Sequence, residues 1–215
     1  MFFKNRIEAG QYLAQAVRKS GKDFSGFEVI GLARGGVPVA KPVAESLGLP
    51  LKAMCIDDLS VNGNKLVLTT FGSGLLYKLG RPVDGAQRVD LAPRWIDNSL
   101  HQLELPSLPE FLTKLRMREQ KYNNGRALQF GSKVLLIDDG MVSGTTIEVA
   151  VRALRQQGVE EVVVAIPVVL PWTKNAHFDF ELISWRVSTM KHAATGMFYY
   201  EFEDTPDQQV MAATA

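Results

Sequence analysis

The sequence predicts an α/β protein built on a doubly wound, mostly parallel sheet. Two observations carry this prediction. Short apolar runs bounded by glycine or polar residues, which are typical of buried strands, alternate with stretches of helical periodicity. In addition, residues 27–56 follow the order strand, turn, helix, strand, which predicts parallel strands joined by a right-handed crossover. The expected strands lie at residues 27–32, 51–56, 134–137, 161–168 and 183–187.

Helices are expected between these strands. Asn5 and Glu8 have the spacing of a capping pair, and the apolar stripe that follows predicts a first helix that ends near Gly21. A second helix is expected to stop at Gly48, and Pro42 within it removes one backbone hydrogen bond. This second helix is expected over residues 38–47. Further helices are expected over residues 106–122 and 147–157, and after Thr205-Pro206.

Residues 57–105 form the least regular part of the chain. Residues 66–70 and 75–77 are expected to form a small hairpin around Gly72 and Gly74. Asp57-Asp58 directly follows the second strand, and it is expected to be either a solvated turn or a pair of metal ligands.

Composition and charge exclude several classes of protein. A net charge of +1 and a pI of about 7.8 argue against binding to nucleic acid or membranes by bulk electrostatics. The single cysteine, Cys55, leaves no internal disulfide and no cysteine-based zinc cluster, and the three histidines have no metal spacing. The polar N-terminus predicts no signal peptide, and no apolar run approaches the ~20 residues that span a bilayer. We therefore expect a cytoplasmic protein.

The most informative stretch is residues 134–146, Val-Leu-Leu-Ile-Asp-Asp-Gly-Met-Val-Ser-Gly-Thr-Thr. Four apolar residues end in the carboxylates of Asp138 and Asp139, and a loop of small residues leads into an amphipathic helix. The free N–H groups and the dipole of a helix N-terminus attract phosphate. Carboxylates at a strand end can accept hydrogen bonds from sugar hydroxyls or hold Mg²⁺ through water. The stretch therefore predicts a ligand that carries a phosphate and nearby hydroxyls.

This stretch resembles the 5-phosphoribosyl-1-pyrophosphate (PRPP) motif of the type I phosphoribosyltransferases. Residues 31–38, Gly-Leu-Ala-Arg-Gly-Gly-Val-Pro, are similar to the pyrophosphate-loop segment of a bacterial phosphoribosyltransferase-like family of uncertain substrate. Residues 3–10, 162–168 and 198–200 are also similar to that family. The resemblance covers residues 3–56 and 105–210.

The resemblance implies a single phosphoribosyltransferase-like domain over residues 1–215. A small hood would be formed by the N-terminal helix and the C-terminal segment, with residues 57–80 as a further candidate. No internal repeat, low-complexity tract or linker in the sequence argues for a second domain.

The resemblance also implies roles for the matching residues. Asp138 and Asp139 would be the catalytic pair that holds the ribose 2′- and 3′-hydroxyls. Mg²⁺ would be held through the pyrophosphate and water, with Asp57 and Asp58 as candidate ligands. The expected phosphate-binding loop consists of Gly140, Met141, Val142, Ser143, Gly144, Thr145 and Thr146, and the expected pyrophosphate loop of Ala33, Arg34, Gly35 and Gly36.

The function implied is a Mg²⁺-dependent phosphoribosyltransferase of nucleotide metabolism, which moves ribose 5-phosphate from PRPP to a nitrogen acceptor such as a nucleobase. PRPP or another ribose phosphate and an unidentified acceptor base would be its partners, with a homodimer as a further candidate and neither membrane nor nucleic acid expected. Two positions depart from the family pattern. Asp57-Asp58 stands where basic residues are usual, and Thr145 stands where glycine is common. The two carboxylates of Asp57-Asp58 would repel the pyrophosphate unless Mg²⁺ bridges them, since one charge reversal at about 4 Å is worth several kcal/mol.

Two other functions stay open. The protein could be a non-catalytic sensor that binds a phosphorylated ribose or nucleotide, an alternative that Asp57-Asp58 favours. A weaker alternative is an RNA-binding regulator that uses the helix face of Lys114, Arg118 and Lys121, although such a pattern is more often a solvated face.

The aromatic residues of the last third of the chain are expected in the core or on a dimer surface, rather than as a platform for bases. Cys55, within an apolar strand, is expected to be buried. The aromatic set is Trp172, Trp185, Phe198, Tyr199 and Tyr200.

Overall fold

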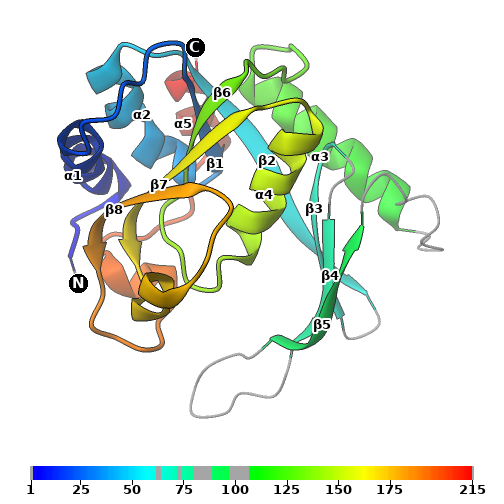
Figure 1. Cartoon of the computed structure of the whole chain (residues 1–215). Helices are drawn as coiled ribbons and strands as arrows, with labels where there is room; N and C mark the ends of the chain where they lie inside the picture. The colour runs from blue at the N-terminus through cyan, green and yellow to red at the C-terminus, as the bar shows by residue number, and fades with distance from the viewer. Residues whose placement is uncertain (1, 62–63, 72–73, 80–88, 97–106, 215) are drawn as a thin grey trace.

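The computed structural model describes residues 2–61, 64–71, 74–79, 89–96 and 107–214. Its strands are β1 (Glu28–Ala33), β2 (Leu51–Val61), β3 (Asn64–Thr69), β4 (Gly74–Leu79), β5 (Val89–Ile96), β6 (Lys133–Ile137), β7 (Glu161–Val169) and β8 (Glu181–Val187). They form one sheet in the order β5-β4-β3-β2-β1-β6-β7-β8 (Figure 1). The neighbouring strands β2, β1, β6, β7 and β8 are parallel to one another. The neighbouring strands β2, β3, β4 and β5 pair antiparallel. The predicted α/β fold class is confirmed.

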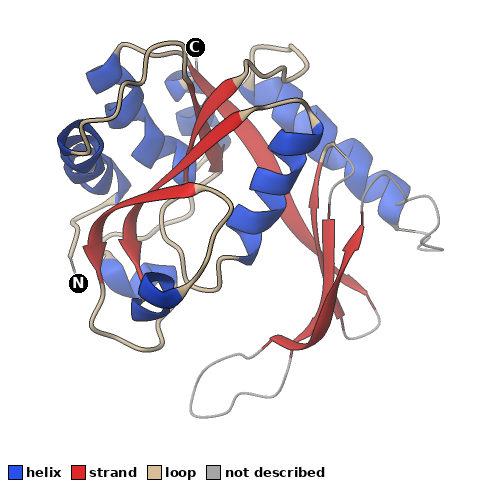
Figure 2. Ribbon diagram, viewed as in Figure 1, coloured by secondary structure: helices blue, strands red, loops and turns tan. Residues whose placement is uncertain are grey.

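Helices cover both faces of the parallel strands (Figure 2). One face is covered by α1 and α2 and the other by α4, while α3 lies against β2. The helical elements are α1 (Arg6–Lys19), α2 (Gly36–Leu47), α3 (Leu108–Tyr122), α4 (Thr145–Gln156), α5 (Asp207–Ala213) and the short 3₁₀ helices η2 (Pro171–Asn175) and η3 (Thr195–Phe198).

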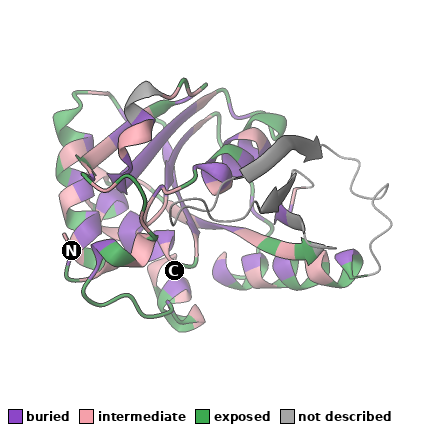
Figure 3. Ribbon diagram, turned by 90° about the horizontal axis from the view of Figure 1, so that it is seen from below, coloured by how far each residue is buried: buried purple, intermediate pink, exposed green. Residues whose placement is uncertain are grey.

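Strand β6 shows how the two-faced core arises. Leu135 packs with α1 and α2, whereas the next residue, Leu136, packs with α4. Both are fully buried, because successive side chains of a strand point to opposite faces. Buried residues accordingly run along the central strands and the inward sides of the helices (Figure 3). This explains why the strands read as continuous apolar runs rather than alternating ones.

Most expected elements form within a few residues of their predicted bounds. Asn5 caps α1, since its side chain accepts a hydrogen bond from the Glu8 N–H. The hairpin of β3 and β4 is confirmed by their antiparallel pairing. Helix α2 starts at Gly36, two residues before the expected start, and contains Pro42.

Within residues 57–105, the described part of the structure differs from the prediction at two strands. Strand β2 does not end at Ile56 but continues through Asp57-Asp58 to Val61, and pairs there with β3. The expected solvated turn is therefore wrong. Strand β5 was not expected at all, and it extends the antiparallel end of the sheet.

Residues 2–3 lie beside residues 198–200, which are far away in sequence. The N–H groups of Phe2 and Phe3 donate to the Phe198 carbonyl, and the Tyr200 N–H donates to the Phe3 carbonyl. Helix α1 packs along α2 and touches β7 and β8. No helix in the described part of the chain has the length and apolar character needed to cross a membrane.

Candidate functional site

The carboxyl ends of β1 and β6 lie side by side, because these strands are parallel neighbours in which Gly31 pairs with Ile137. The turn after β1 therefore meets the carboxylates after β6. A Cβ atom on Gly36 would lie 2.7 Å from the Ile137 carbonyl oxygen, and one on Gly35 would lie 2.3 Å from Oδ2 of Asp139. Only glycine fits at both positions. The expected pyrophosphate loop thus packs directly on the acidic pair.

Arg34 belongs to the same turn and is partly open to solvent. Its side chain is 40% exposed, and its guanidinium lies 3.6 Å from the carboxylate of Asp204, which is almost fully exposed. The Ala33–Arg34 peptide bond is cis. Because exposed ion pairs are weak, the Arg34 guanidinium can exchange Asp204 for an anionic ligand.

The acidic pair sits in a largely dry environment. Burial and the neighbouring charge of Asp139 raise the pKa of Asp138 well above its usual range. Burial also raises the pKa of Asp139, and the guanidinium of Arg6 partly offsets this rise. The Asp139 N–H donates to Oδ1 of Asp138 at 2.8 Å. Two buried carboxylates side by side favour a ligand that supplies hydrogen-bond donors or positive charge.

Two residues from the ends of the chain hold Asp139, and sequence reasoning assigned a site role to neither. Arg6, the first residue of α1, donates from Nε to Oδ2 of Asp139 at 2.8 Å. The hydroxyl of Tyr199 donates to the Asp139 carbonyl at 2.6 Å. The only signal for Arg6 was its place beside the capping residue Asn5, which puts it at a helix start. Tyr199 was expected in the core or on a dimer surface, and it is buried.

The loop between β6 and α4 is fastened to the body of the protein at two points. Met141 is buried, and its N–H donates to the Val168 carbonyl at 3.3 Å. The indole N–H of Trp172, in η2, donates to the Val142 carbonyl at 2.8 Å. The Met141 N–H is therefore engaged within the protein, and the ligand-facing part of the expected phosphate loop begins after it. Trp172 is a loop anchor that the sequence analysis had placed only in the core or at a dimer surface.

The glycine at position 144 supplies the unusual backbone conformation of this loop. Gly144 has φ of 80°, and its neighbour Thr145 is the first residue of α4. Thr145, which stands where glycine is common, thus needs no left-handed conformation, because that conformation falls one residue earlier. Around it, the Thr145 N–H donates to the Ser143 hydroxyl at 3.4 Å, and Ser143 is exposed.

Helix α4 therefore starts at the open end of the loop. Its first intrahelical bond runs from the Glu148 N–H to the Gly144 carbonyl at 2.9 Å. The N–H groups of a first helical turn have no hydrogen-bond partner within the helix, and they point outward along the helix axis. The turn after the acidic pair thus ends in an anion-attracting helix start, as expected for a phosphate-binding loop.

Asp57 and Asp58 point to opposite faces of β2, because they are successive residues of one strand. They therefore cannot converge as a pair on one ion. The Asp57 carboxylate accepts a hydrogen bond from the Arg118 guanidinium at 2.5 Å. Cys55 pairs with Ala33 at the end of β1, so Asp57 follows at the edge where the turn begins. The negative charge expected to repel pyrophosphate is thus balanced by a cation from α3.

Two other cations of α3, Lys114 and Lys121, also pair within the chain. Lys114 contacts Glu110 at 2.6 Å on an exposed surface, and Lys121 contacts Asp207 at 3.0 Å. The face proposed for RNA is therefore a mixed-charge surface. Among the described residues there is also no group of three or more histidine, cysteine, aspartate or glutamate side chains that could hold a metal ion.

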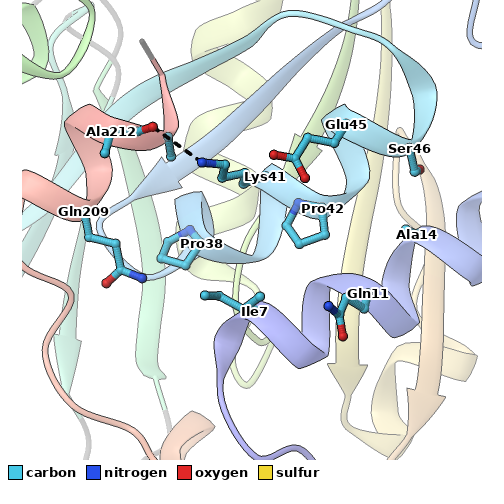
Figure 4. A pocket seen from close by; sticks show the side chains of 11 residues that line it. Ile7, Gln11, Ala14, Pro38, Lys41, Pro42, Glu45, Ser46, Gln209 and Ala212 are labelled. Carbon is cyan, nitrogen blue, oxygen red and sulfur yellow. Dashed lines mark hydrogen bonds between the residues drawn. The ribbon is translucent and has the colours of Figure 1, made fainter.

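A separate groove of about 640 Å³ lies between α1, α2 and α5 (Figure 4). Pro38 and Pro42 point into this groove from α2. At one end of the groove, the Lys41 ammonium donates a hydrogen bond to the Ala212 carbonyl at 3.5 Å. Its lining contains none of the expected site residues. The acidic pair and the glycine turn therefore remain the candidate site.

Comparison with known proteins agrees with this geometry. The family model described as "Phosphoribosyl transferase domain" matches residues 96–197. Two curated proteins from strains of Mycobacterium tuberculosis, whose names assign them provisionally to the phosphoribosyl transferases, are 30% identical over 216 residues. The alignment covers 98% of this chain and 46% of each relative. The chain thus spans about half the length of the curated relatives it matches.

A solved structure has the same fold over its whole length. A crystal structure of a Thermus thermophilus protein is 28% identical, with a TM-score of 0.70. The similarity covers 100% of this chain and 98% of that one. The overall fold of this chain has therefore already been seen in a crystal.

Proposed function

Because this chain belongs to the phosphoribosyl transferase family, we propose that it transfers ribose 5-phosphate from PRPP to a nitrogen acceptor. The observation that carries the proposal is the contact between the acidic pair and the glycine turn, with Oδ2 of Asp139 so close to Gly35 that no Cβ fits between them. The loop after Asp139 leads directly into the start of α4. One phosphorylated sugar can reach all three features.

Each part of PRPP has a matching group in this proposal. Asp138 and Asp139 accept hydrogen bonds from the ribose hydroxyls, and residues 142–146 bind the 5′-phosphate at the start of α4. Arg34 binds the pyrophosphate, together with the backbone of Gly35 and Gly36. The Arg34 side chain is exposed enough to leave Asp204 for this purpose.

The reaction exchanges one bond at ribose C1 for another. The bond from C1 to the pyrophosphate oxygen breaks, the bond from C1 to the acceptor nitrogen forms, and the nitrogen loses its proton to water. Positive charge develops on the ribose ring in the transition state. Ionised carboxylates in a buried site stabilise such charge more strongly than they would in water. We assign this role to Asp138 and Asp139.

Mg²⁺, when bound with PRPP, neutralises charge on the leaving pyrophosphate. Sites of this kind take most of their Mg²⁺ ligands from phosphate oxygens and water, so they need no dedicated protein cage. Asp57 is the candidate for a water-mediated contact, because it lies on the same face of β2 as Cys55, which packs with α2.

Calorimetry tests ligand binding directly. We expect the protein to bind PRPP and ribose 5-phosphate, with PRPP binding strengthened by Mg²⁺. Asp139→Asn keeps the size of the side chain and removes its charge, so we expect at least about tenfold weaker binding of ribose 5-phosphate. The absence of binding by the wild-type protein, or unchanged binding by Asp139→Asn, contradicts the proposal.

A second candidate function is a sensor that binds a phosphorylated ribose or nucleotide without turnover. The position of Asp57 at the pyrophosphate side of the site favours it. This candidate predicts ligand binding without pyrophosphate release when purine and pyrimidine bases are supplied with PRPP and Mg²⁺. Pyrophosphate release with any base would remove the sensor and support the transferase.

We propose a cytoplasmic location and a homodimer. Light scattering after size-exclusion chromatography measures the oligomeric state, and a mass of one chain would contradict the dimer.

A further inference from the structure

The guanidinium of Arg6 joins three parts of the chain that are distant in sequence. Its Nε donates to Oδ2 of Asp139 at 2.8 Å, and its Nη1 donates to the Glu203 carbonyl at 2.6 Å. Its central carbon lies 3.9 Å from the centre of the Phe202 ring. The Arg6 side chain is only 13% exposed. A buried arginine whose contacts all converge on one carboxylate and one segment is held in a fixed position.

Small residues make room for this position. Asn5 caps α1 and so fixes Arg6 as the first residue of the helix. A Cβ atom on Gly10 would lie 2.4 Å from the Val39 carbonyl oxygen, so glycine lets α1 approach α2 closely. A Cβ atom on Gly35 would lie 3.1 Å from Nε of Arg6. Close helix packing and an open turn together bring the start of α1 to the acidic pair.

The segment that holds Arg6 also holds the backbone of Asp139. Residues 198–203 pair with residues 2–4, since the Glu201 N–H donates to the Lys4 carbonyl at 2.8 Å. The hydroxyl of Tyr199, within the same segment, donates to the Asp139 carbonyl at 2.6 Å. We call residues 2–6 together with residues 198–203 the terminal clasp. The clasp thus fixes Asp139 at two atoms, one in the side chain and one in the main chain.

We infer that Arg6 is a positioning residue for ribose recognition, acting through Asp139. Among the described residues, Arg6 takes Oδ2 of Asp139, which leaves Oδ1 to face a sugar hydroxyl. In the described part of the chain, the other titratable groups that interact with this carboxylate are Asp138 and Tyr199. The inference rests on the proposed function, because it assumes that Asp139 binds a ribose hydroxyl.

The inference predicts that losing Arg6 affects the binding of two kinds of ligand differently. Ribose 5-phosphate uses both the phosphate loop and Asp139, whereas inorganic phosphate uses the loop alone. Loss of Arg6 therefore weakens binding of the sugar phosphate and leaves binding of inorganic phosphate unchanged. A residue that served only to stabilise the fold would affect both ligands equally.

The experiment measures the affinity of both ligands by calorimetry for Arg6→Gln, Arg6→Lys and a control. The control is Arg18→Gln on the same helix, whose guanidinium donates to the Ser46 carbonyl away from the site. We expect ribose 5-phosphate binding to weaken at least about tenfold in Arg6→Gln, the loss typical of one charge-assisted hydrogen bond. Arg6→Lys keeps the charge and should recover part of this loss, and Arg18→Gln should bind both ligands normally.

Each other outcome overturns the inference. Equal weakening of both ligands in Arg6→Gln would assign Arg6 to the fold alone, and unchanged binding would remove its role. If Arg6→Gln does not fold, Tyr199→Phe decides the question, because it keeps the ring and removes only the contact to the Asp139 carbonyl. Tyr199→Phe should then weaken ribose 5-phosphate selectively, and equal effects on both ligands would contradict the clasp. If wild-type protein binds inorganic phosphate but not ribose 5-phosphate, the proposed function fails together with this inference.

Discussion

The indole N–H of Trp172 donates to the carbonyl of Val142 at 2.8 Å, and its ring lies 3.1 Å from the point where a Cβ atom on Gly144 would stand. One aromatic side chain therefore fixes the middle of the expected phosphate loop. It does so from η2, an element that follows β7 and is remote from the loop in sequence. The loop is thus shaped by tertiary contact as well as by its own small residues.

Trp172→Phe keeps an aromatic ring in place and removes the hydrogen bond to Val142. We expect the free energy of unfolding to fall by about 1 kcal/mol, the usual contribution of one hydrogen bond. Because the loop is less well held, inorganic phosphate should bind about fivefold more weakly. Urea denaturation and calorimetry measure the two effects. Trp185→Phe is the control, since Trp185 packs against Phe3 and Tyr12, and loss of phosphate binding there would contradict a specific role of Trp172.

Gly35→Ala places a methyl group where the Asp139 carboxylate now lies. The Cβ would stand 2.3 Å from Oδ2 of Asp139, so either the carboxylate or the turn must move. We expect a loss of about 1–3 kcal/mol in stability and a loss of ribose 5-phosphate binding. Gly131→Ala is the matched control, because the nearest atom, in Glu28, lies 4.0 Å from its Cβ. Normal sugar phosphate binding by Gly35→Ala would show that the turn does not depend on close contact with Asp139.

Glu119 makes the stability of the fold depend on pH. It is buried on α3, where its carboxylate accepts hydrogen bonds from the Cys55 N–H at 2.9 Å and the Thr70 hydroxyl at 2.7 Å. Burial raises its pKa from 4.5 to about 7. Between these values the folded protein binds the proton more strongly than the unfolded chain. Stability contributed by the protonated form is therefore present below pH 4.5 and is lost as the pH rises to about 7.

Glu119→Gln tests this dependence, because the amide is neutral at every pH. The wild-type protein should lose on the order of 3 kcal/mol between pH 4.5 and pH 7 from this group, and the variant should not. Guanidinium denaturation at several pH values, with the two curves subtracted, isolates the contribution of Glu119. A parallel pH dependence in the two proteins would contradict the raised pKa.

Arg118→Gln leaves the Asp57 carboxylate without its partner. Since Asp57 lies at the edge where the glycine turn begins, its unbalanced charge should weaken binding of PRPP more than binding of ribose 5-phosphate. The ion pair is partly exposed, with side chains 33% and 39% accessible, so its loss should change stability by no more than about 1 kcal/mol. Calorimetry with both ligands measures the difference.

Lys114→Gln provides the control for that measurement. Lys114 lies on the same helix but pairs with Glu110 on an exposed surface. It should leave both affinities unchanged. Equal loss of PRPP and ribose 5-phosphate binding in Arg118→Gln would mean that Asp57 does not act on the pyrophosphate.

Local patterns in the sequence predicted much of this fold. The strands around residues 27–32 and 134–137 are central and buried on both faces, so they read as apolar runs. Asn5 and Gly48 marked helix ends because capping chemistry is local. The same reasoning failed at Asp57-Asp58. There a strand continues past charged residues because its partner β3 and the cation of Arg118 are supplied by distant parts of the chain.

The candidate site likewise contains residues that local sequence patterns predict and residues that they do not. The acidic pair, the phosphate loop and the glycine turn are each contiguous in sequence, so their patterns could be recognised. The roles of Arg6 and Trp172 depend on partners far along the chain: Arg6 meets Asp139 across 133 positions and Glu203 across 197. No periodicity or spacing signals a contact of that kind. Their chemistry becomes visible only when the chain is folded.

The terminal clasp also sets the order in which the site can be completed on the ribosome. Asp138 and Asp139 leave the ribosome with β6, whereas Tyr199 and the Glu203 carbonyl emerge about 60 residues later. Until then Arg6 has no carbonyl or ring from residues 198–203 to hold it. A nascent chain that has formed its central strands would thus carry two buried carboxylates in an unfinished pocket. Competence to bind sugar phosphate would therefore arise only after residue 203 has been synthesised.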